Sequence, residues 1–458
     1  MKKVLMISYF FPPVGGIGTA GSQRTLKFAK YIQSHDWTPV ILTVRESHYE
    51  SYFELDASLL GKVPSGINIV RTPVIRWLTK LLELKNRGRA SIPTSGHIEN
   101  ATNGNHSNGA APASRNRYQK LKNAFTDLFE IPDGEIGWLI PGVISGLRAI
   151  RREGVDVIYT SGKPWTAHLI GVVLRGLTGK PLVTDFRDPW LTNPFRDQSM
   201  KFRNRVEGYL EQKVVSEADL VITNTVLLRD EFIARFPREA ESKFVALLNG
   251  YDPDDFPRSA AGAEVGDGKF VLVHSGFLYG KRDPRNFLEA LTLLLRTQRI
   301  PREKIEVHFV GSVELPYNLP EFLRANGLEG VVHLVPHVPF QRSLEYLSRA
   351  TALLLLQPGT ETQIPSKLFE YIAMGRPILT ISPLHGATSK LVMEESLGIA
   401  TDAENVNEIA LALERLYHDW KGGSRFIGGS TAREKFNVRK AAENLSRNFD
   451  RLLDRGES

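Results

Sequence analysis

The chain has 458 residues, of which 42% are hydrophobic and 24% are charged, as in an ordinary soluble protein. This length allows two to four domains. No run of about 18 apolar residues occurs, so no membrane-spanning helix is predicted. The absence of cysteine excludes disulfides, thiolate metal sites and cysteine nucleophiles, and it fits a reducing cytoplasm.

The positive charge is concentrated in one segment. The formal net charge is +7, and residues 71–122 hold ten Lys or Arg against two acidic residues. Within this segment, residues 86–117 are rich in Asn, Gly, Ser and Ala and are predicted to be a disordered insertion. The flanks carry Trp77, Phe125 and Phe129 at helical spacing, which indicates core-facing helices or, alternatively, helices lying on a membrane surface. The charge suggests an anionic partner, either a membrane or a nucleic acid.

Strands and helices alternate in both halves of the chain, which predicts parallel, doubly wound sheets. The opening residues are interpreted as a first strand and not as a signal peptide, because no small-residue cleavage site follows them. In the first half, strands are expected over 3–10, 39–44, 67–74, 155–160, 182–186 and 220–223, and helices over 22–34, 165–177 and 202–216. In the second half, strands are expected over 270–274, 306–310, 331–335, 352–356 and 378–381, and helices over 284–296, 319–326, 342–349, 366–374 and 404–416.

The predicted fold class is therefore α/β, with two Rossmann-like doubly wound domains facing a cleft. Ligands are expected at the carboxyl ends of both sheets. Residues 1–250 are expected to form the N-terminal domain and residues 269–430 the C-terminal domain. Residues 251–268 have the composition of a hinge linker. Residues 431–458 are predicted to be a C-terminal helix that packs back toward the N-terminal domain.

The most informative stretch is 364–378, Ile-Pro-Ser-Lys-Leu-Phe-Glu-Tyr-Ile-Ala-Met-Gly-Arg-Pro-Ile, which follows a buried strand. Pro365 suits the first turn of a helix. Ser366 and Lys367 then fall at the helix N-terminus, where free N–H groups, the helix dipole and the lysine charge favour a phosphate. Glu370 lies one turn further along the same face, where its carboxylate can accept hydrogen bonds from the two hydroxyls of a ribose. These features predict a nucleotide site; the alternative is an ordinary strand–helix–strand unit with a solvated Lys and Glu.

Two loops that follow strands could also contact phosphates. Gly15 and Gly16 lie in a glycine-rich loop after the first strand, although their spacing differs from a dinucleotide-binding fingerprint. In the second half, Gly276 allows close approach of the backbone to a ligand. Lys281 and Arg282 follow it and can neutralise a pyrophosphate.

Two candidates for chemistry follow strands of the first half. Asp188 belongs to the stretch Asp-Phe-Arg-Asp-Pro-Trp, residues 185–190, which could hold a sugar; the alternative is a buried Arg–Asp pair. His168 falls three residues into a predicted helix, where a packing histidine is the more common case.

Together these motifs resemble the family-four retaining glycosyltransferases of the GT-B fold, over nearly the whole chain. The resemblance rests on five motifs: Pro-Pro-x-Gly-Gly at 12–16, Asp-Leu-Val-Ile-Thr-Asn at 219–224, Asn-Gly-Tyr-Asp at 249–252, Ser-Gly-Phe-Leu-Tyr-Gly-Lys-Arg at 275–282 and Pro-Ser-Lys-Leu-Phe-Glu-Tyr-Ile-Ala-Met-Gly-Arg-Pro at 365–377.

The resemblance implies hexosyl or N-acetylhexosaminyl transfer from a nucleotide-diphosphate sugar held mainly by the C-terminal domain. The N-terminal domain would hold a glycan or polyprenyl-linked acceptor. No cofactor and no nucleic acid are expected. No metal is expected either, because basic residues and a helix dipole would stabilise the leaving diphosphate. A role in polysaccharide biosynthesis is implied, in the cytoplasm or at the inner face of an anionic membrane. The expected donor-binding residues are Gly15, Gly16, Gly276, Glu361, Ser366, Lys367, Leu368 and Glu370, and the catalytic candidates are Asp188, His168, Lys281 and Arg282.

The sequence departs from the family at one position. Many members have a second glutamate eight residues before the ribose-binding one, whereas this chain has Thr362 there and Glu361 one residue earlier. Glu361 would still reach the donor sugar if the loop is one residue longer. Two other functions stay open: a nucleotide-sugar epimerase of the same architecture, and a non-catalytic protein that binds a nucleotide sugar. An oxidoreductase is not favoured, for lack of a dinucleotide fingerprint.

Overall fold

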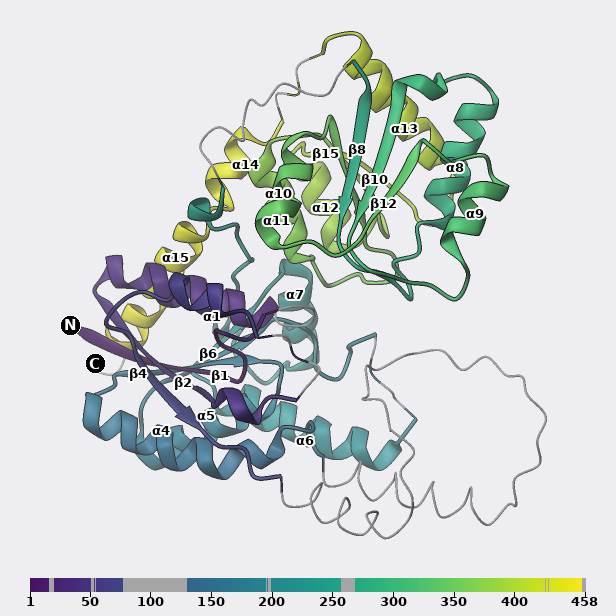
Figure 1. The fold of residues 1–458 in the computed structure, drawn as a ribbon. Helices are drawn as coiled ribbons and strands as arrows, with labels where there is room; N and C mark the ends of the chain where they lie inside the picture. Colours follow the sequence, from purple (N-terminus) through teal and green to yellow (C-terminus); the bar gives the residue numbers. More distant parts are fainter. Residues whose placement is uncertain are drawn as a thin grey trace. The chain divides into compact units, whose positions relative to one another are not determined.

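The computed structural model describes two compact units of the chain (Figure 1). The N-terminal unit comprises Met1–Asn224, Arg229–Leu247 and Ala442–Ser458, and the C-terminal unit comprises Thr225–Leu228 and Leu248–Ala441. The described residues are 1–15, 20–50, 53, 55–76, 130–194, 196, 199–256, 268–424, 426 and 428–454. The insertion predicted at 86–117, its flanks with Trp77, Phe125 and Phe129, and most of the predicted linker lie outside them. None of the described helices is long and apolar enough to cross a membrane.

The N-terminal unit contains one parallel sheet with the strand order β3-β2-β1-β4-β5-β6-β7. Its strands are β1 (Lys2–Ser8), β2 (Trp37–Val44), β3 (Asn68–Thr72), β4 (Val157–Gly162), β5 (Leu182–Phe186), β6 (Leu220–Thr223) and β7 (Phe244–Ala246). Its helices are α1 (Ala20–Tyr31), α4 (Leu139–Glu153), α5 (Thr166–Thr178), α6 (Lys201–Glu217) and most of α7 (Val226–Arg235). Helices α4 and α5 cover one face of the sheet and α1 the other (Figure 1).

The C-terminal unit repeats this plan with the strand order β12-β10-β8-β13-β14-β15, again all parallel. Its strands are β8 (Phe270–Ser275), β10 (Ile305–Val310), β12 (Val332–Val335), β13 (Ala352–Leu356), β14 (Ile378–Ile381) and β15 (Gly398–Thr401), with a separate pair of β9 (Leu278–Tyr279) and β11 (Val313–Glu314). Its helices are α8 (Arg285–Arg296), α9 (Leu319–Ala325), α10 (Phe340–Ser348), α11 (Ser366–Met374), α12 (Ala387–Glu394), α13 (Val406–Lys421) and α14 (Ser430–Lys435). These sheets confirm the prediction of two doubly wound, Rossmann-like domains.

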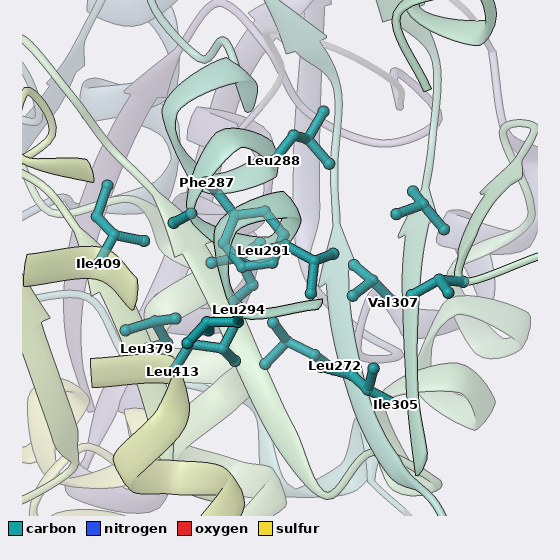
Figure 2. Packing of buried hydrophobic residues seen from close by; sticks show 14 of the residues in the cluster. Leu272, Phe287, Leu288, Leu291, Leu294, Ile305, Val307, Leu379, Ile409 and Leu413 are labelled. Carbon is teal, nitrogen blue, oxygen red and sulfur yellow. The ribbon is translucent and has the colours of Figure 1, made fainter. Parts of the chain in front are cut away.

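One face of the C-terminal sheet is covered by α8 and α13, which bury a continuous apolar cluster (Figure 2). Phe287, Leu291 and Leu294 recur on α8 at helical spacing and pack on Leu272 of β8 and Val307 of β10. All five side chains are at most 1% exposed. Burial of each one stabilises the unit by about 1.5–3 kcal/mol. This cluster holds the strands, and therefore the loops at their carboxyl ends, in fixed positions.

The C-terminal segment forms two helices, α14 and α15 (Val438–Asp454), where one helix was predicted over 431–458. The break follows from Tyr251 of the Asn-Gly-Tyr-Asp motif. Its N–H donates to the Phe436 carbonyl at 3.1 Å, and its carbonyl accepts from the Val438 N–H at 3.0 Å. This backbone pairing interrupts the helix between the two partners. The motif therefore anchors α14 and the first residues of α15 within the C-terminal unit.

From Ala442 onward α15 belongs to the N-terminal unit. The Phe449 ring lies 5.1 Å from the Trp37 ring and 6.1 Å from the Tyr159 ring. The Asp450 carboxylate accepts from Lys2 Nζ at 2.6 Å and from the Trp37 indole at 3.1 Å. The last helix is thus an integral part of the N-terminal unit's core.

Candidate functional site

The strand order of the C-terminal sheet reverses between β8 and β13. In doubly wound sheets, ligands bind outside the carboxyl ends of the strands at such a reversal. β8 ends at Ser275 and β13 at Leu356, so the residues that follow these two strands line the expected place. They include most of the predicted donor-binding residues of this unit.

Lys367, at the start of α11, lies directly over Gly276. A Cβ atom added to Gly276 would lie 2.6 Å from Lys367 Cε and 3.0 Å from its Nζ, so only glycine leaves room for the lysine in this position. Burial and the charge of Arg282 lower the pKa of the Lys367 ammonium, while Glu370 acts in the opposite direction. Lys367 and Gly276 were both predicted to bind the donor, and the structure places the two residues in contact.

The first turn of α11 presents further groups. Pro365 is the residue immediately before the helix, and Ser366 is its exposed first residue. The Leu368 side chain is fully buried and its N–H donates to the Pro365 carbonyl at 3.0 Å, so Leu368 helps to position the turn. The N–H groups of Ser366 and Lys367 belong to the first turn, so they have no acceptor within the helix. They lie at the positive end of the helix dipole.

Tyr371 joins this helix to the end of β8. Its hydroxyl accepts a hydrogen bond from the Ser275 N–H at 2.9 Å and donates to the Leu354 carbonyl of β13 at 3.3 Å. Nearby, His274 is fully buried with its Nδ1 2.9 Å from the same carbonyl, and burial lowers its pKa to about 3. The neutral imidazole carries a buried Nε2 with no hydrogen-bond partner among the described residues.

The other two cations belong to the loop after β9. Arg282 donates to the side-chain oxygen of Gln357 at 3.1 Å, and Gln357 donates to the Thr360 hydroxyl at 2.6 Å. Lys281 is exposed and extends over Gly359, whose added Cβ would lie 3.2 Å from Lys281 Nζ. The β9 loop and the loop after β13 are therefore joined by side chains, and the β9 loop brings two positive charges to the edge of the sheet that holds Lys367.

Glu370 and Glu361 are placed differently. Glu370 is half-buried one turn beyond Ser366, and its charge raises the pKa of Lys367. Glu361 is exposed, and its carboxylate lies 3.0 Å from His385 Nε2. Its backbone carbonyl accepts from the Ala387 N–H of α12 at 2.7 Å. Glu361 therefore lies in a loop fixed to α12, with its carboxylate facing solvent.

In the N-terminal unit, His168 lies in the interior. It is fully buried, stacks on Trp165 and contacts the Phe186 ring at 4.6 Å. Its Nδ1 lies 2.7 Å from the Thr160 hydroxyl, and burial lowers its pKa to about 3. Its Nε2 has no partner among the described residues and points to Gly162, where an added Cβ would lie 2.4 Å away. At pH 7 His168 is a neutral group whose one available atom faces the end of β4.

Asp188 is half-buried in the loop after β5. Burial lowers the pKa of the neighbouring Arg187, and the charge of Asp188 acts in the opposite direction. Arg187 donates to the carbonyl oxygens of Gly162 at 2.9 Å and Lys163 at 2.6 Å. Gly15 is buried against Asp56 and Leu59, and Gly16 lies outside the described residues.

The N-terminal unit contains a buried ion pair whose arginine the sequence did not indicate. The Arg24 guanidinium donates to both oxygens of Asp185, at 2.7 and 2.9 Å, and Tyr159 donates to the same carboxylate at 2.5 Å. The Arg–Asp pair considered for residues 185–190 therefore exists, but its arginine comes from α1. No local motif indicated this partner.

Comparison with known proteins agrees with this architecture. The model "Glycosyl transferase 4-like domain" matches residues 110–250, and the model "Glycosyl transferases group 1" matches residues 269–419. The D-inositol 3-phosphate glycosyltransferase of Paenarthrobacter aurescens is 24% identical over 304 residues, 63% of this chain and 72% of the relative. The enzyme of the same name from Arthrobacter sp. is also 24% identical, over 303 residues, 63% of this chain and 70% of the relative.

Two solved structures share the fold at low sequence identity. Sucrose-phosphate synthase from Thermosynechococcus elongatus has a TM-score of 0.62 and 15% identity, covering 99% of this chain and 100% of that chain. The Anabaena protein HepE in complex with UDP has a TM-score of 0.59 and 14% identity, covering 98% of this chain and 100% of that chain.

Two Rossmann-like units and two matching glycosyltransferase domains define the class: the chain is a glycosyltransferase of the GT-B fold. Within that class, it carries a glycosyl transferase 4-like domain followed by a group 1 domain.

Proposed function

We propose that this glycosyltransferase transfers a sugar from a nucleotide-diphosphate donor to a glycan or lipid-linked acceptor, with retention of anomeric configuration and without a metal in the reaction. One observation carries the proposal. Three cations, Lys281, Arg282 and Lys367, gather with the helix start of α11 at the carboxyl edge of the C-terminal sheet. This arrangement suits a diphosphate.

The cations would act mainly in the transition state. When the glycosidic bond breaks, negative charge grows on the leaving diphosphate, and fixed positive groups stabilise that charge. Lys367 is held against Gly276 and Arg282 against Gln357, so little reorganisation is needed during the reaction. These cations would supply the positive charge that a bound divalent ion supplies in other enzymes that act on phosphate groups.

Glu370 would bind the ribose, and Glu361 would approach the donor sugar. HepE was solved with UDP and, separately, with UDP-glucose, which makes UDP the first nucleotide to test. The curated relatives are D-inositol 3-phosphate glycosyltransferases, so inositol phosphate belongs in the acceptor panel together with polyprenyl-linked glycans. His168 and Asp188 remain catalytic candidates in the N-terminal unit, which would hold the acceptor. The basic segment 71–122 remains a candidate for contact with an anionic membrane.

The binding test compares wild type, Glu370→Ala and Glu289→Ala by calorimetry with UDP, GDP and ADP sugars. Loss of a charged hydrogen-bond partner costs about 1.5–3 kcal/mol, so Glu370→Ala should weaken donor binding roughly 10- to 100-fold. Glu289, an exposed residue of α8, is the matched control and should leave the affinity unchanged. Equal donor affinity for wild type and Glu370→Ala would contradict the ribose assignment.

The reaction test follows the product. Nuclear magnetic resonance of the anomeric proton should show the configuration of the donor in the product, and turnover should persist in excess chelator. An inverted product would refute retention. Activity lost on chelation and restored by a divalent ion would refute a metal-independent reaction.

A further inference from the structure

Two histidines and a glutamate lie together on neighbouring strands of the C-terminal unit, β10 and β12 (Figure 1). Glu306 and His308 are two residues apart on β10, so their side chains extend from the same face of the sheet. His333 of β12 is the direct register partner of His308 in the parallel pair. Two rigid strands therefore set the positions of all three side chains.

The spacing of the three side chains suits a single ion. His308 Nε2 lies 3.5 Å from Glu306 Oε2, and the rings of His308 and His333 are 4.8 Å apart. One ligand atom from each residue lies within 4.8 Å of the other two. Nitrogen and oxygen ligands about 2.0–2.1 Å from a tetrahedral zinc lie roughly 3.4 Å apart, so small side-chain rotations would complete the geometry.

One ring nitrogen of the cluster is available to a ligand. The His308 Nδ1 atom is buried and has no hydrogen-bond partner among the described residues.

We propose that Glu306, His308 and His333 bind one divalent transition-metal ion, with Zn²⁺ as the first candidate. Two imidazoles and one carboxylate favour such an ion over Mg²⁺ or Ca²⁺, which require mostly oxygen ligands. The side chains of His308 and Glu306 are 20% and 26% exposed, so an ion can reach them and a water molecule can complete the coordination. Lys269 holds the other oxygen of Glu306 at 2.6 Å and leaves Oε2 available.

This site is separate from the proposed donor site. Glu306 is the second residue of β10, whereas the donor residues follow the carboxyl ends of β8 and β13. Glu306 and His308 lie four and two residues before the carboxyl end of β10, or about 13 and 7 Å of strand. A bound ion would join β12, the edge strand, to β10 and would stiffen this edge of the sheet. Its role is therefore structural, and glycosyl transfer does not pass through it.

The test uses the full chain without a polyhistidine tag and measures Zn²⁺ binding in competition with a fluorescent chelator. The variants are Glu306→Gln and His333→Asn. The matched control is His418→Asn, because His418 is also paired with a glutamate, Glu414, at 3.9 Å but lacks a third ligand. Changes outside the coordinating atoms already cost about 10- to 100-fold in metal affinity, and loss of a ligand should cost at least as much.

Wild type and His418→Asn should bind one equivalent of Zn²⁺, and both cluster variants should bind it at least tenfold more weakly. Co²⁺ should give the visible absorption of a tetrahedral site in wild type and His418→Asn but not in the two cluster variants. Melting without metal checks that each variant is folded, and UDP binding reports separately on the proposed donor site. Absence of stoichiometric Zn²⁺ binding by wild type, or unchanged affinity in both cluster variants, would overturn the proposal.

Discussion

Lys367, a residue of the proposed phosphate site, is held in place by its contact with Gly276. Its side chain is half-buried against Gly276, where burial and Arg282 lower its pKa, yet Glu370 keeps a negative charge nearby. A partly buried ammonium group held in this way is stabilised most when an anionic ligand binds beside it. The energetic effect of Lys367 should therefore appear on donor binding and turnover more than on folding.

Replacement of either lysine of the proposed phosphate site should act on turnover. Lys281→Ala and Lys367→Ala are each expected to lower kcat about 10- to 100-fold, with a smaller rise in KM, because the lost charge matters most as the diphosphate leaves. Steady-state kinetics of donor hydrolysis would measure both constants. Lys390→Ala, an exposed lysine of α12, should behave as wild type. A rise in KM at constant kcat would show that the lysines serve ground-state binding only.

Glu135 should make the N-terminal unit less stable as pH rises. Burial, with a contribution from Asp133, raises the pKa of Glu135 from 4.5 to about 7. Between these values the unfolded chain is ionised and the folded chain is not, so the free energy of unfolding falls as pH rises through this window and levels off above pH 7. The loss is about 3 kcal/mol at 1.36 kcal/mol per pKa unit.

Urea unfolding at pH 5 and pH 8 would measure this effect. His168 of the same unit has a pKa lowered to about 3, which acts in the opposite direction up to pH 6.5, so the effect of Glu135 is read as a difference between variants. The free energy of unfolding of wild type relative to Glu135→Gln should fall from pH 5 to pH 8, whereas Glu241→Gln, at an exposed glutamate of the same unit, should show the pH dependence of wild type. The same pH dependence in wild type and Glu135→Gln would show that Glu135 is ionised in the folded state.

At the scale of elements, the junction of β8, β13 and α11 depends on one hydroxyl. Tyr371→Phe leaves the buried Ser275 N–H without its acceptor, which should destabilise the C-terminal unit by about 1–3 kcal/mol. Because Gly276 follows Ser275, donor affinity should fall as well. Thermal unfolding and UDP calorimetry would measure the two effects. Tyr417→Phe removes the hydroxyl of a buried ring of α13 on the other face of the sheet and should spare UDP binding.

The sequence predicted several elements to the residue. The runs 182–186, 220–223, 352–356 and 378–381 match β5, β6, β13 and β14, because each is a short apolar run bounded by Gly, Pro or polar residues. Helix α13 begins at Val406 and not at Glu404, because the Asn405 side chain accepts from the Glu408 N–H and caps the helix. β15 was missed. It begins with Gly398, which lies so close to the Ile378 backbone that no side chain fits, so no apolar run marks this strand.

The sequence predicted the part of the candidate site that a single helix supplies. It did not predict the contacts between residues that lie far apart in the chain. Ser366, Lys367 and Glu370 share one helix, so helical spacing was sufficient. The contact of Lys367 with Gly276 and the bond from Arg282 to Gln357 join residues more than seventy positions apart. Glu306 and His308 alternate with apolar residues as in any half-exposed strand, and only the register of β12 brings His333 beside them.

At the scale of the molecule, α15 ties the end of the chain to the core of the N-terminal unit. Phe449→Ala removes a fully buried ring that contacts Trp37 and Tyr159, and such a change costs about 3–5 kcal/mol. Differential scanning calorimetry should show a lower transition for the N-terminal unit, and UDP should not restore it. Phe202→Ala, whose ring is 61% exposed on α6, should leave that transition unchanged. Equal melting of Phe449→Ala and wild type would mean that α15 contributes little to this core.

The ion pair between Lys2 and Asp450 has a consequence for how the chain can be rearranged. Two residues near opposite ends of the sequence lie 2.6 Å apart in one unit, so a short peptide could join the termini. A circular permutant opened between Leu247 and Leu248 would then carry each unit as one stretch of sequence, apart from Thr225–Leu228, which would still lie within the N-terminal stretch. In the natural order, residues from Ala442 onward follow the C-terminal unit in the sequence, so the core of the N-terminal unit is completed only after the C-terminal unit has been synthesised.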